Sequence, residues 1–366
     1  MVAGAELIIF LVAAAVSLGA SYVLVTRLER IGERLGLSEG LLGVLAALAG
    51  DAPEITSAVT ALSMHQNKVG AGVVIGSNVF NLAALLGLGA VVAGRIALHR
   101  KVVLLGGVVG TWIAVVCLVT VLGLIPAGVA LVAALAALIP YLIVLGASRA
   151  RLARIPLARR WAAWLAEAVS EEEAELEEVI HPAHGRARDV AVAVAMLVIV
   201  VGASVVMEQA ATRLGVHFSI PPIIIGGVVL AAVTSLPNSV AAVYLAARGR
   251  GAAMLSTTLN SNALNVTAGL LVPATITGLG APSGQASLIA VWYLALTLIA
   301  LAFAYRYSGM TRATGALIIG AYLVFLGSLW IVAHTAEPGL AGSVVPLAFV
   351  VACSGAGLAG RRWRLR

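Results

Sequence analysis

The chain is 366 residues long, 61% hydrophobic and 11% charged, with a mean hydropathy of +1.06. A soluble domain carries roughly 25% charged residues, so this composition predicts an all-α polytopic membrane protein. The net charge of +7 could suggest a nucleic-acid partner, but the distribution of the charge predicts membrane topology and no nucleic acid.

Apolar runs of about twenty residues predict eleven membrane helices. In chain order they lie at 5–26, 40–64, 69–94, 101–122, 124–147, 189–212, 221–247, 251–276, 285–305, 313–333 and 341–359. With this arrangement every Lys and Arg except Lys68 and Arg213 falls on one side of the lipid bilayer. The positive-inside rule then predicts a protein of the cytoplasmic membrane, with its N-terminus outside and its C-terminus in the cytoplasm.

Two parts of the chain align without gaps at an offset of 184 residues. Pro53 aligns with Pro237, and Ser77, Asn78 and Asn81 align with Ser261, Asn262 and Asn265. Each part holds five predicted helices, an odd number, so the second must cross the membrane in the opposite orientation. We expect two inverted five-helix repeats, ten transmembrane helices in all, at 1–147 and 189–334, with a cytoplasmic linker at 148–188 and an appended helix and basic tail at 335–366.

The predicted linker is the longest polar stretch, with arginines at its start and a run of glutamates near its end. It could act as a cation sensor or lie as a basic amphipathic segment on anionic lipid. A solvated charged helix that only joins the two repeats is the favoured interpretation, because no EF-hand spacing is present.

Asp51 and Glu54 lie on either side of Pro53 in the second apolar segment. A charge at bilayer depth costs at least ~2.5–3.5 kcal/mol, so it normally serves an ion or a proton. Pro53 lacks an N–H and should free backbone carbonyls beside these acids. Ser77 and Asn81 share one face of the next helix, and the second repeat has Thr234, Ser235, Asn238, Ser261 and Asn265 at related positions.

These candidates are all hard oxygen donors, without Cys or His, which suits Na⁺, Ca²⁺ or Mg²⁺ rather than zinc or copper. The paired motifs resemble the sodium/calcium exchanger family of the cation/calcium antiporter superfamily. The motifs that carry this resemblance are Gly50-Asp-Ala-Pro-Glu54, Gly76-Ser-Asn-Val-Phe-Asn81, Thr234-Ser-Leu-Pro-Asn238 and Asn260-Ser-Asn-Ala-Leu-Asn265. The resemblance implies ten helices around a cluster of cation sites, with ligands at Glu54, Ser77, Asn81, Thr234, Ser235 and Ser261 and at the carbonyls of Ala47 and Ala231.

Three departures from the family pattern change the charge of the site. Asn238 stands where the family usually has glutamate, Asn265 where it commonly has aspartate, and Asp51 where it usually has serine. Two acids remain, both in the first repeat. They can still neutralise one Ca²⁺, but we expect fewer Na⁺ ions or coupling to protons, since two close carboxylates can share a proton.

The sequence thus predicts a cation antiporter that exchanges Ca²⁺ for Na⁺ by alternating access, with no cofactor and no enzymatic activity. A proton-coupled Ca²⁺ antiporter, a monovalent cation/proton antiporter and an ion channel remain alternatives. An intramembrane hydrolase is disfavoured, because no H-E-x-x-H or G-x-S-x-G motif is present. The oligomeric state stays open.

Several of the candidate residues have a structural alternative. The three asparagines could form hydrogen bonds between helices, and Ser77, Ser261 and Thr234 could line helix contacts without touching an ion. Glu208, near the outer end of its predicted helix, is expected at the membrane interface rather than among the ligands.

Overall fold

The computed structural model describes residues 2–35, 37, 39–146, 164, 167–168 and 187–334. Within them, seven helices are long and apolar enough to cross a membrane, and two bent helix pairs raise that number to nine. The helical run Gly251–Thr277, which covers the predicted segment 251–276, is not among these nine. The predicted helix at 341–359 and nearly all of the predicted linker lie outside the described residues.

The first half of the chain contains a series of helices and one short strand. They are α1 (Val2–Arg34), α2 (Glu39–Gly50), α3 (Ala52–Ser63), α4 (Asn67–Asn81), the π-helix η1 (Leu82–Leu88), α5 (Gly89–Ala93), β1 (Arg95–Ala97), α6 (Arg100–Val121) and α7 (Ala127–Leu145). Helix α1 continues well past its predicted end at residue 26.

The second half follows the same order. It contains α10 (Ala187–His217), α11 (Pro222–Ile224), the π-helix η2 (Ile225–Leu230), α12 (Ala231–Thr234), α13 (Leu236–Ala247), α14 (Gly251–Leu264), the π-helix η3 (Asn265–Leu271), α15 (Val272–Thr277), α16 (Gly284–Arg306), β2 (Gly309–Thr311) and α17 (Arg312–His334).

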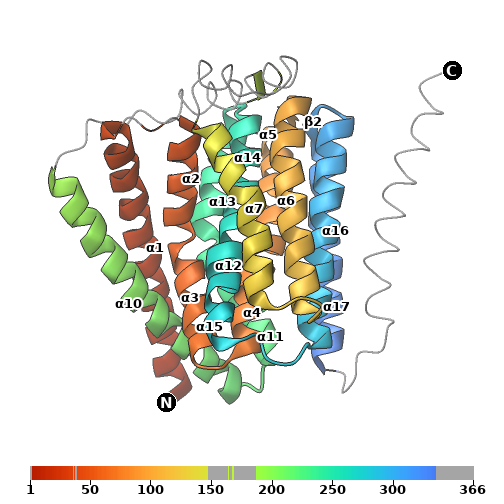
Figure 1. Ribbon diagram of the computed structural model, residues 1–366. Coiled ribbons are helices and arrows are strands. Elements are labelled where there is room, and N and C mark those ends of the chain that lie inside the picture. The colour runs from red at the N-terminus through yellow and green to blue at the C-terminus, as the bar shows by residue number, and fades with distance from the viewer. Residues whose placement is uncertain are drawn as a thin grey trace.

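The helices run up and down between two ends of the molecule (Figure 1). We call the end where α1 begins, and where α3 connects to α4 and α10 to α11, the amino-terminal face. The opposite end, where α5 connects to α6 and α13 to α14, is the linker face. Of the described Lys and Arg residues, only Lys68 and Arg213 belong to the amino-terminal face.

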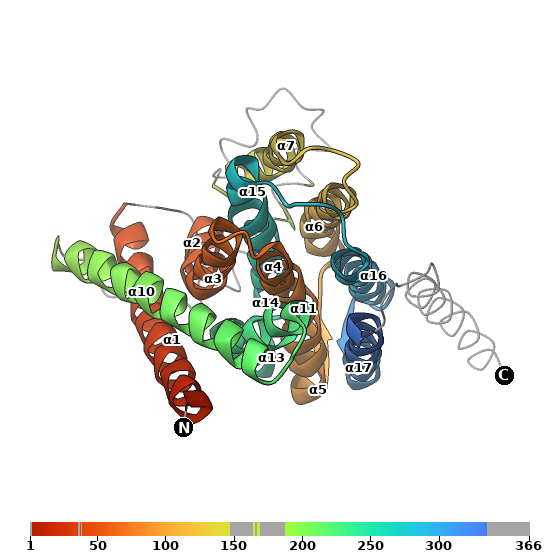
Figure 2. The same cartoon turned by 90° about the horizontal axis from the view of Figure 1, so that it is seen from below.

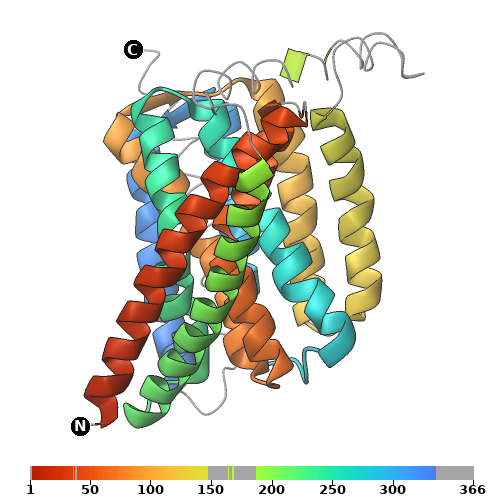
Figure 3. The same cartoon turned by 90° about the vertical axis from the view of Figure 1, so that its left-hand side faces the viewer.

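Helices α1 and α10 lie together along one side of the bundle (Figures 2 and 3). Arg27 pairs with the buried Asp189 at 2.7 Å near the linker face. Ser17 and Ser204 share a hydrogen bond of 2.8 Å, and Arg213 pairs with Glu6 at 3.2 Å near the amino-terminal face. Polar contacts therefore join these two helices along most of their length.

Each half contains a bent helix at the proline that the repeat predicts. The axes of α2 and α3 differ by 51°, and those of the α11–α12 run and α13 differ by 49°. Pro53 and Pro237 stand in the first turn after each bend, where a missing N–H breaks the helical hydrogen-bond ladder. The nearly equal angles agree with two related halves.

The two halves approach closely where α4 crosses η2. A Cβ added to Gly76 would lie 2.3 Å from the carbonyl oxygen of Gly227, and one added to Gly72 would lie 2.8 Å from the Gly227 nitrogen. Only glycine permits two backbones to come this near. This crossing holds α4, and with it the polar residues of its second half, against the second repeat.

Short contacts at the linker face also join distant parts of the chain. Strand β1 pairs antiparallel with β2, with Ile96 opposite Met310. Lys101, at the start of α6, pairs with Glu167, one of the few described residues between the halves. The hydrogen bond from Lys101 holds the pKa of the Glu167 carboxyl below its ordinary value.

Candidate functional site

The two acids of the first half lie at its helix break, deep inside the protein. Asp51 occupies the break between α2 and α3, and Glu54 lies in the first turn of α3. Both side chains are 0% exposed. No Lys or Arg forms an ion pair with either of them among the described residues, so their charge is met only by neutral groups.

Glu54 is held by two groups of the second half. Ser235 donates its hydroxyl hydrogen bond to Oε1, and Asn265 donates from Nδ2 to Oε2. A hydrogen bond to a charged group is worth ~1.5–3 kcal/mol. Both oxygens of this carboxylate therefore accept hydrogen bonds across the boundary between the repeats.

Asp51 is also held from the second half, but through one oxygen. Its Oδ1 accepts a hydrogen bond of 2.5 Å from Asn238 Nδ2 and one of 2.7 Å from Ser261 Oγ. Its Oδ2 is buried and has no hydrogen-bond partner among the described residues. One oxygen of Asp51 is thus left for a further ligand.

The contacts of the two acids are related by the internal repeat. An offset of 184 residues turns Asp51 into Ser235 and Glu54 into Asn238. The Asp51–Asn238 contact and the Glu54–Ser235 contact are therefore the same contact seen from the two halves. In this repeated contact, the residues from the first half are both acids, and the residues from the second half are both neutral.

Asparagines of α4, α14 and η3 form the next part of this cluster. Asn81 Nδ2 lies 3.3 Å from Ser261 Oγ and 3.1 Å from Asn262 Oδ1, and Asn265 Nδ2 lies 3.3 Å from Asn78 Oδ1. The structure thus brings the predicted residues Asn81, Asn265 and Ser261 together. Side-chain hydrogen bonds between helices, the alternative for these asparagines, are present as well.

The sequence interpretation left Asn78 and Asn262 out of the site. Asn78 Nδ2 donates to the Asn262 carbonyl at 3.0 Å, and Asn262 Nδ2 donates back to the Asn78 carbonyl at 3.2 Å. This reciprocal pair joins α4 to α14 beside the acids. A signal was available, because the two residues match each other at the offset of the repeat.

Ser77 and Thr234 use their hydroxyl hydrogens inside their own helices. Ser77 donates to the Val73 carbonyl at 2.6 Å, and Thr234 donates to the Leu230 carbonyl at 2.8 Å. Each hydroxyl oxygen keeps acceptor lone pairs. Both predicted ligands are buried, Ser77 within α4 and Thr234 at the end of α12, and both retain the capacity to bind a cation.

The backbone carbonyls of Ala47 and Ala231, which are predicted ligands, accept hydrogen bonds within their own helices. The Ala47 carbonyl accepts the Asp51 N–H at 2.8 Å, and the Ala231 carbonyl accepts the Ser235 N–H at 3.2 Å. The carbonyl that Pro53 leaves without its helical N–H belongs to Ala49, and Ser21 of α1 donates to it at 2.9 Å. The proline thus ties α1 to the bend.

The cluster contains buried oxygens that suit a cation. Asn81 Oδ1 and Asn265 Oδ1, like Asp51 Oδ2, have no hydrogen-bond partner among the described residues. A buried acceptor without a partner costs ~1–3 kcal/mol. A hard cation bound to such oxygens would remove this cost, and amide and carboxylate oxygens are its usual ligands. No group of three or more His, Cys, Asp or Glu occurs in the described ranges, so the cluster does not resemble a transition-metal centre.

The sequence interpretation expected Glu208 at the membrane interface; the structure shows its side chain packed inside the protein. It lies on the inward face of α10 and is 0% exposed. Hydropathy alone could not reveal this, because α10 is apolar on nearly all sides and the sequence does not mark which side packs inward.

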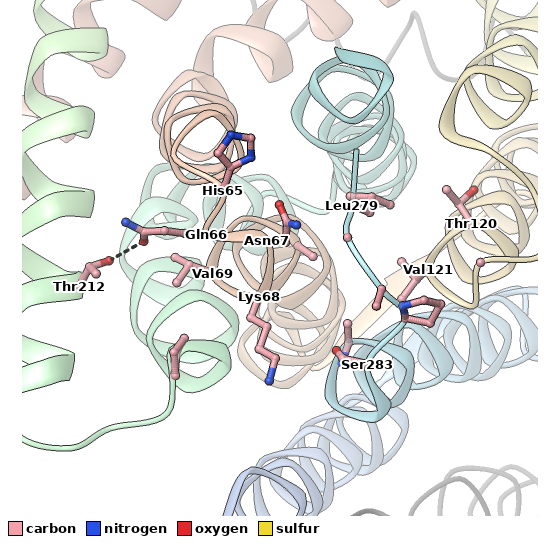
Figure 4. A pocket seen from close by; sticks show the side chains of 17 residues that line it. His65, Gln66, Asn67, Lys68, Val69, Thr120, Val121, Thr212, Leu279 and Ser283 are labelled. Carbon is pink, nitrogen blue, oxygen red and sulfur yellow. Dashed lines mark hydrogen bonds between the residues drawn. The ribbon is translucent and has the colours of Figure 1, made fainter. Parts of the chain in front are cut away.

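A cavity of about 480 Å³ opens at the amino-terminal face. Residues from the α3–α4, α6–α7 and α15–α16 connections and from α10 line it (Figure 4). Thr212 Oγ1 of α10 lies 3.3 Å from Gln66 Oε1 at its wall. None of the predicted site residues lines this cavity, but α3 and α4 lead from it to the acids.

Comparison with known proteins assigns the chain to a family. Residues 5–149 and 190–331 match the family model for sodium/calcium exchanger proteins. The chain belongs to this family. The resemblance seen in the sequence motifs is confirmed, and the two matched ranges coincide closely with the two predicted repeats. Members of the exchanger family are membrane transporters rather than enzymes.

Curated relatives of this exchanger match it over a short region. Sodium/potassium/calcium exchanger 3 of Rattus norvegicus is 38% identical over 73 residues, which is 20% of this chain and 12% of the rat protein. Sodium/potassium/calcium exchanger 4 of Homo sapiens is 37% identical over the same length, again 20% of this chain and 12% of the relative. The match thus spans about an eighth of these relatives.

Solved structures share the fold over nearly the whole exchanger. The H⁺/Ca²⁺ exchanger CAX has a TM-score of 0.69 at 14% identity, covering 98% of this chain and 88% of CAX. The sodium-calcium exchanger NCX_Mj has a TM-score of 0.55 at 20% identity, covering 88% of this chain and 97% of NCX_Mj. At these identities the similarity establishes the fold.

Proposed function

We propose that this exchanger moves Ca²⁺ across the cytoplasmic membrane in exchange for Na⁺. The observation that carries the proposal is the pair of buried acids at the boundary of the two halves, each held by amides and hydroxyls of the opposite half. A cation bound there contacts both repeats at once, as midplane sites of inverted-repeat transporters do.

The proposed ligands form one set around the two breaks. Asp51 and Glu54 supply two negative charges, which balance one Ca²⁺. The neutral oxygens are those of Asn81, Asn238, Asn265, Ser77, Thr234, Ser235 and Ser261 and the carbonyls of Ala47 and Ala231. Where an asparagine now donates to a carboxylate, rotation of its amide would present Oδ1 to the ion instead.

Coupling follows from competition for the same carboxylates. Na⁺ must displace Ca²⁺ from Asp51 and Glu54, and each loaded form then favours one facing of the site. The same ligands thus serve both cargoes, so no nucleotide or resident cofactor is required. We further propose that 1–147 and 189–334 act as the two halves, joined by the cytoplasmic linker at 148–188 and followed by the appended segment 335–366.

The distribution of charge supports an orientation with the amino-terminal face outside. Lys68 and Arg213 are the only Lys and Arg of that face among the described residues, while the linker face carries the remainder. By the positive-inside rule the linker face is then cytoplasmic.

The test is Ca²⁺ uptake into liposomes that contain the purified protein. One set is loaded with Na⁺ at fixed pH, and a parallel set carries an outward proton gradient without Na⁺. Uptake driven by Na⁺ supports the proposal, and equal uptake without either gradient would indicate a channel. Absence of Ca²⁺ uptake under both gradients would remove calcium as the cargo.

A proton-coupled Ca²⁺ exchanger is the second candidate. Both acids lie in the same half, and in the described part of the chain no Lys or Arg pairs with either, so one proton shared between them is a physically reasonable alternative to Na⁺. CAX, which shares this fold, is described as an H⁺/Ca²⁺ exchanger. Uptake driven only by the proton gradient would favour this candidate.

A further inference from the structure

Glu208 is a buried acid that the proposed site does not use. Its side chain is 0% exposed on α10, and no ion pair to it is present among the described residues. Its Oε1 accepts a hydrogen bond of 3.0 Å from Thr212, whereas its Oε2 is buried without a partner. Burial of such a carboxylate calls for a cation or a proton close to it.

Glu208 is connected to the cavity at the amino-terminal face. Thr212, one helical turn further along α10, lies 3.0 Å from Glu208 and 3.3 Å from Gln66 Oε1. Thr212 and Gln66 both line the cavity (Figure 4). From the open space into the protein, an amide oxygen, a hydroxyl and a carboxylate therefore follow one another.

The same line continues toward the candidate site. Helix α10 packs against α3, the helix that carries Glu54. Ser57 lies one turn from Glu54 on α3, toward the amino-terminal face, and its buried hydroxyl has no partner among the described residues. Unsatisfied polar groups are thus present on both helices between the cavity and Glu54.

The charges around this line favour a small cation. Arg213 is paired with Glu6 on the outside of the bundle. Lys68 lines the cavity but is exposed, and its side chain extends away from the Gln66–Thr212 contact in Figure 4. The single carboxylate of Glu208 balances one monovalent ion but leaves a divalent ion half neutralised.

We propose that Glu208, Thr212 and Gln66 form a second site for Na⁺, on the route between the cavity and the acids at the breaks. The ion loses part of its water there before it reaches Asp51 and Glu54, which lowers the barrier to loading from the amino-terminal face. This inference rests on the proposed function for its view of Na⁺ as a transported ion, but the binding itself can be tested separately.

The first experiment measures binding of ²²Na⁺ to purified protein. In the double variant Asp51→Asn, Glu54→Gln the central charges are absent, and we expect saturable Na⁺ binding to remain. Adding Glu208→Gln should abolish that binding, and Thr212→Val, which keeps the shape of the side chain, should weaken it severalfold. Adding Glu6→Gln, which removes another acid of the same face, should leave it unchanged.

The second experiment measures transport by sided addition of Na⁺ to proteoliposomes with one orientation. Glu208→Gln should raise the half-saturating Na⁺ concentration severalfold at the amino-terminal face and leave it unchanged at the linker face. An equal change at both faces, or no change at either, would contradict the route.

The two proposals can fail independently. If Na⁺ drives no Ca²⁺ uptake in the wild-type protein, the proposed coupling is wrong. The binding experiment still tests whether the second site exists. If the double variant binds no Na⁺, or still binds it after Glu208→Gln in a protein that remains monodisperse, the second site is excluded.

Discussion

At the scale of single residues, Asp51 and Glu54 make the two halves one unit. Every hydrogen bond given above for their carboxylates comes from the second repeat. In the proposed function, the acids therefore contribute both the charge for a cation and part of the contact between the repeats. Changes at the two positions should separate these roles.

Glu54→Gln should remove exchange and leave the fold intact. The amide keeps the size of the side chain but loses the negative charge that a cation needs, and it exchanges two charge-assisted hydrogen bonds for weaker neutral ones. Ca²⁺ uptake should fall to background. Size-exclusion chromatography in detergent supplies the control, and retained uptake would remove Glu54 from the site.

Gly50→Ala tests how closely the second repeat must approach Asp51. A Cβ at this position would lie 2.4 Å from Asn238 Oδ1, so the amide must move away from the break. We expect about tenfold weaker Ca²⁺ binding, the equivalent of one lost hydrogen bond to a charged group. Isothermal titration of the purified variant measures the change, and an unchanged affinity would show that Asn238 is not needed.

The sequence predicted that polar residues from both repeats form one cluster, but not which of these residues contact each other. Helical spacing shows that Ser77 and Asn81 share a face, and the repeat indicates their counterparts. It does not show that Glu54 contacts Ser235 and Asn265 across the boundary, because that depends on how the halves pack. Asn78 and Asn262 could have been included, because they match each other at the offset of the repeat, but their mutual hydrogen bonds could not be predicted for the same reason.

At the scale of the elements, prolines and glycines set the geometry. The prolines explain the two bends, and both could be predicted from the sequence. The π-helices η1, η2 and η3 could not, because no residue pattern marks a π-turn in an apolar helix. The glycine crossing of α4 and η2 likewise becomes visible only when the two segments lie side by side.

Gly76→Ala should destabilise the protein strongly. The added methyl would lie 2.3 Å from a backbone oxygen of η2, which cannot swing aside as a side chain can. Overpacking of this kind costs ~1–3 kcal/mol, and here we expect the upper end. Gly320→Ala in α17 is the matched control, because nothing lies within 4 Å of its added Cβ.

Thermal unfolding of both variants in the same detergent measures this difference. Gly76→Ala should melt several degrees below the wild-type protein, and Gly320→Ala should match it or melt slightly higher, since alanine favours a helix over glycine. Equal melting of the two variants would show that the crossing tolerates a side chain.

At the scale of the whole molecule, orientation follows from the two faces. Cysteines placed at Met64 and at Arg248, both exposed, would lie on the amino-terminal and linker faces. In a background without Cys117 and Cys353, an impermeant maleimide added to intact cells should label the first variant alone. Labelling of the second alone would invert the proposed topology.

A chain made of two related halves also allows its charges to be moved. The quadruple variant Asp51→Ser, Ser235→Asp, Glu54→Asn, Asn238→Glu places both acids in the second half while keeping each crossed contact. We expect Ca²⁺ binding within about tenfold of the wild-type affinity. The half-variant Asp51→Ser, Glu54→Asn, which has no acids, should bind no Ca²⁺.

The crossed contacts restrict which substitutions a protein of this kind can accumulate after duplication of an ancestral gene. Asp51 meets Asn238 and Glu54 meets Ser235, at sequence separations of 187 and 181 residues, on either side of the offset of 184. A substitution in one copy is therefore expected to be compensated by a substitution at a different repeat position of the other copy. Drift at either position is constrained by its partner in the opposite copy, so compensating substitutions should join the two copies in pairs rather than accumulate within one of them.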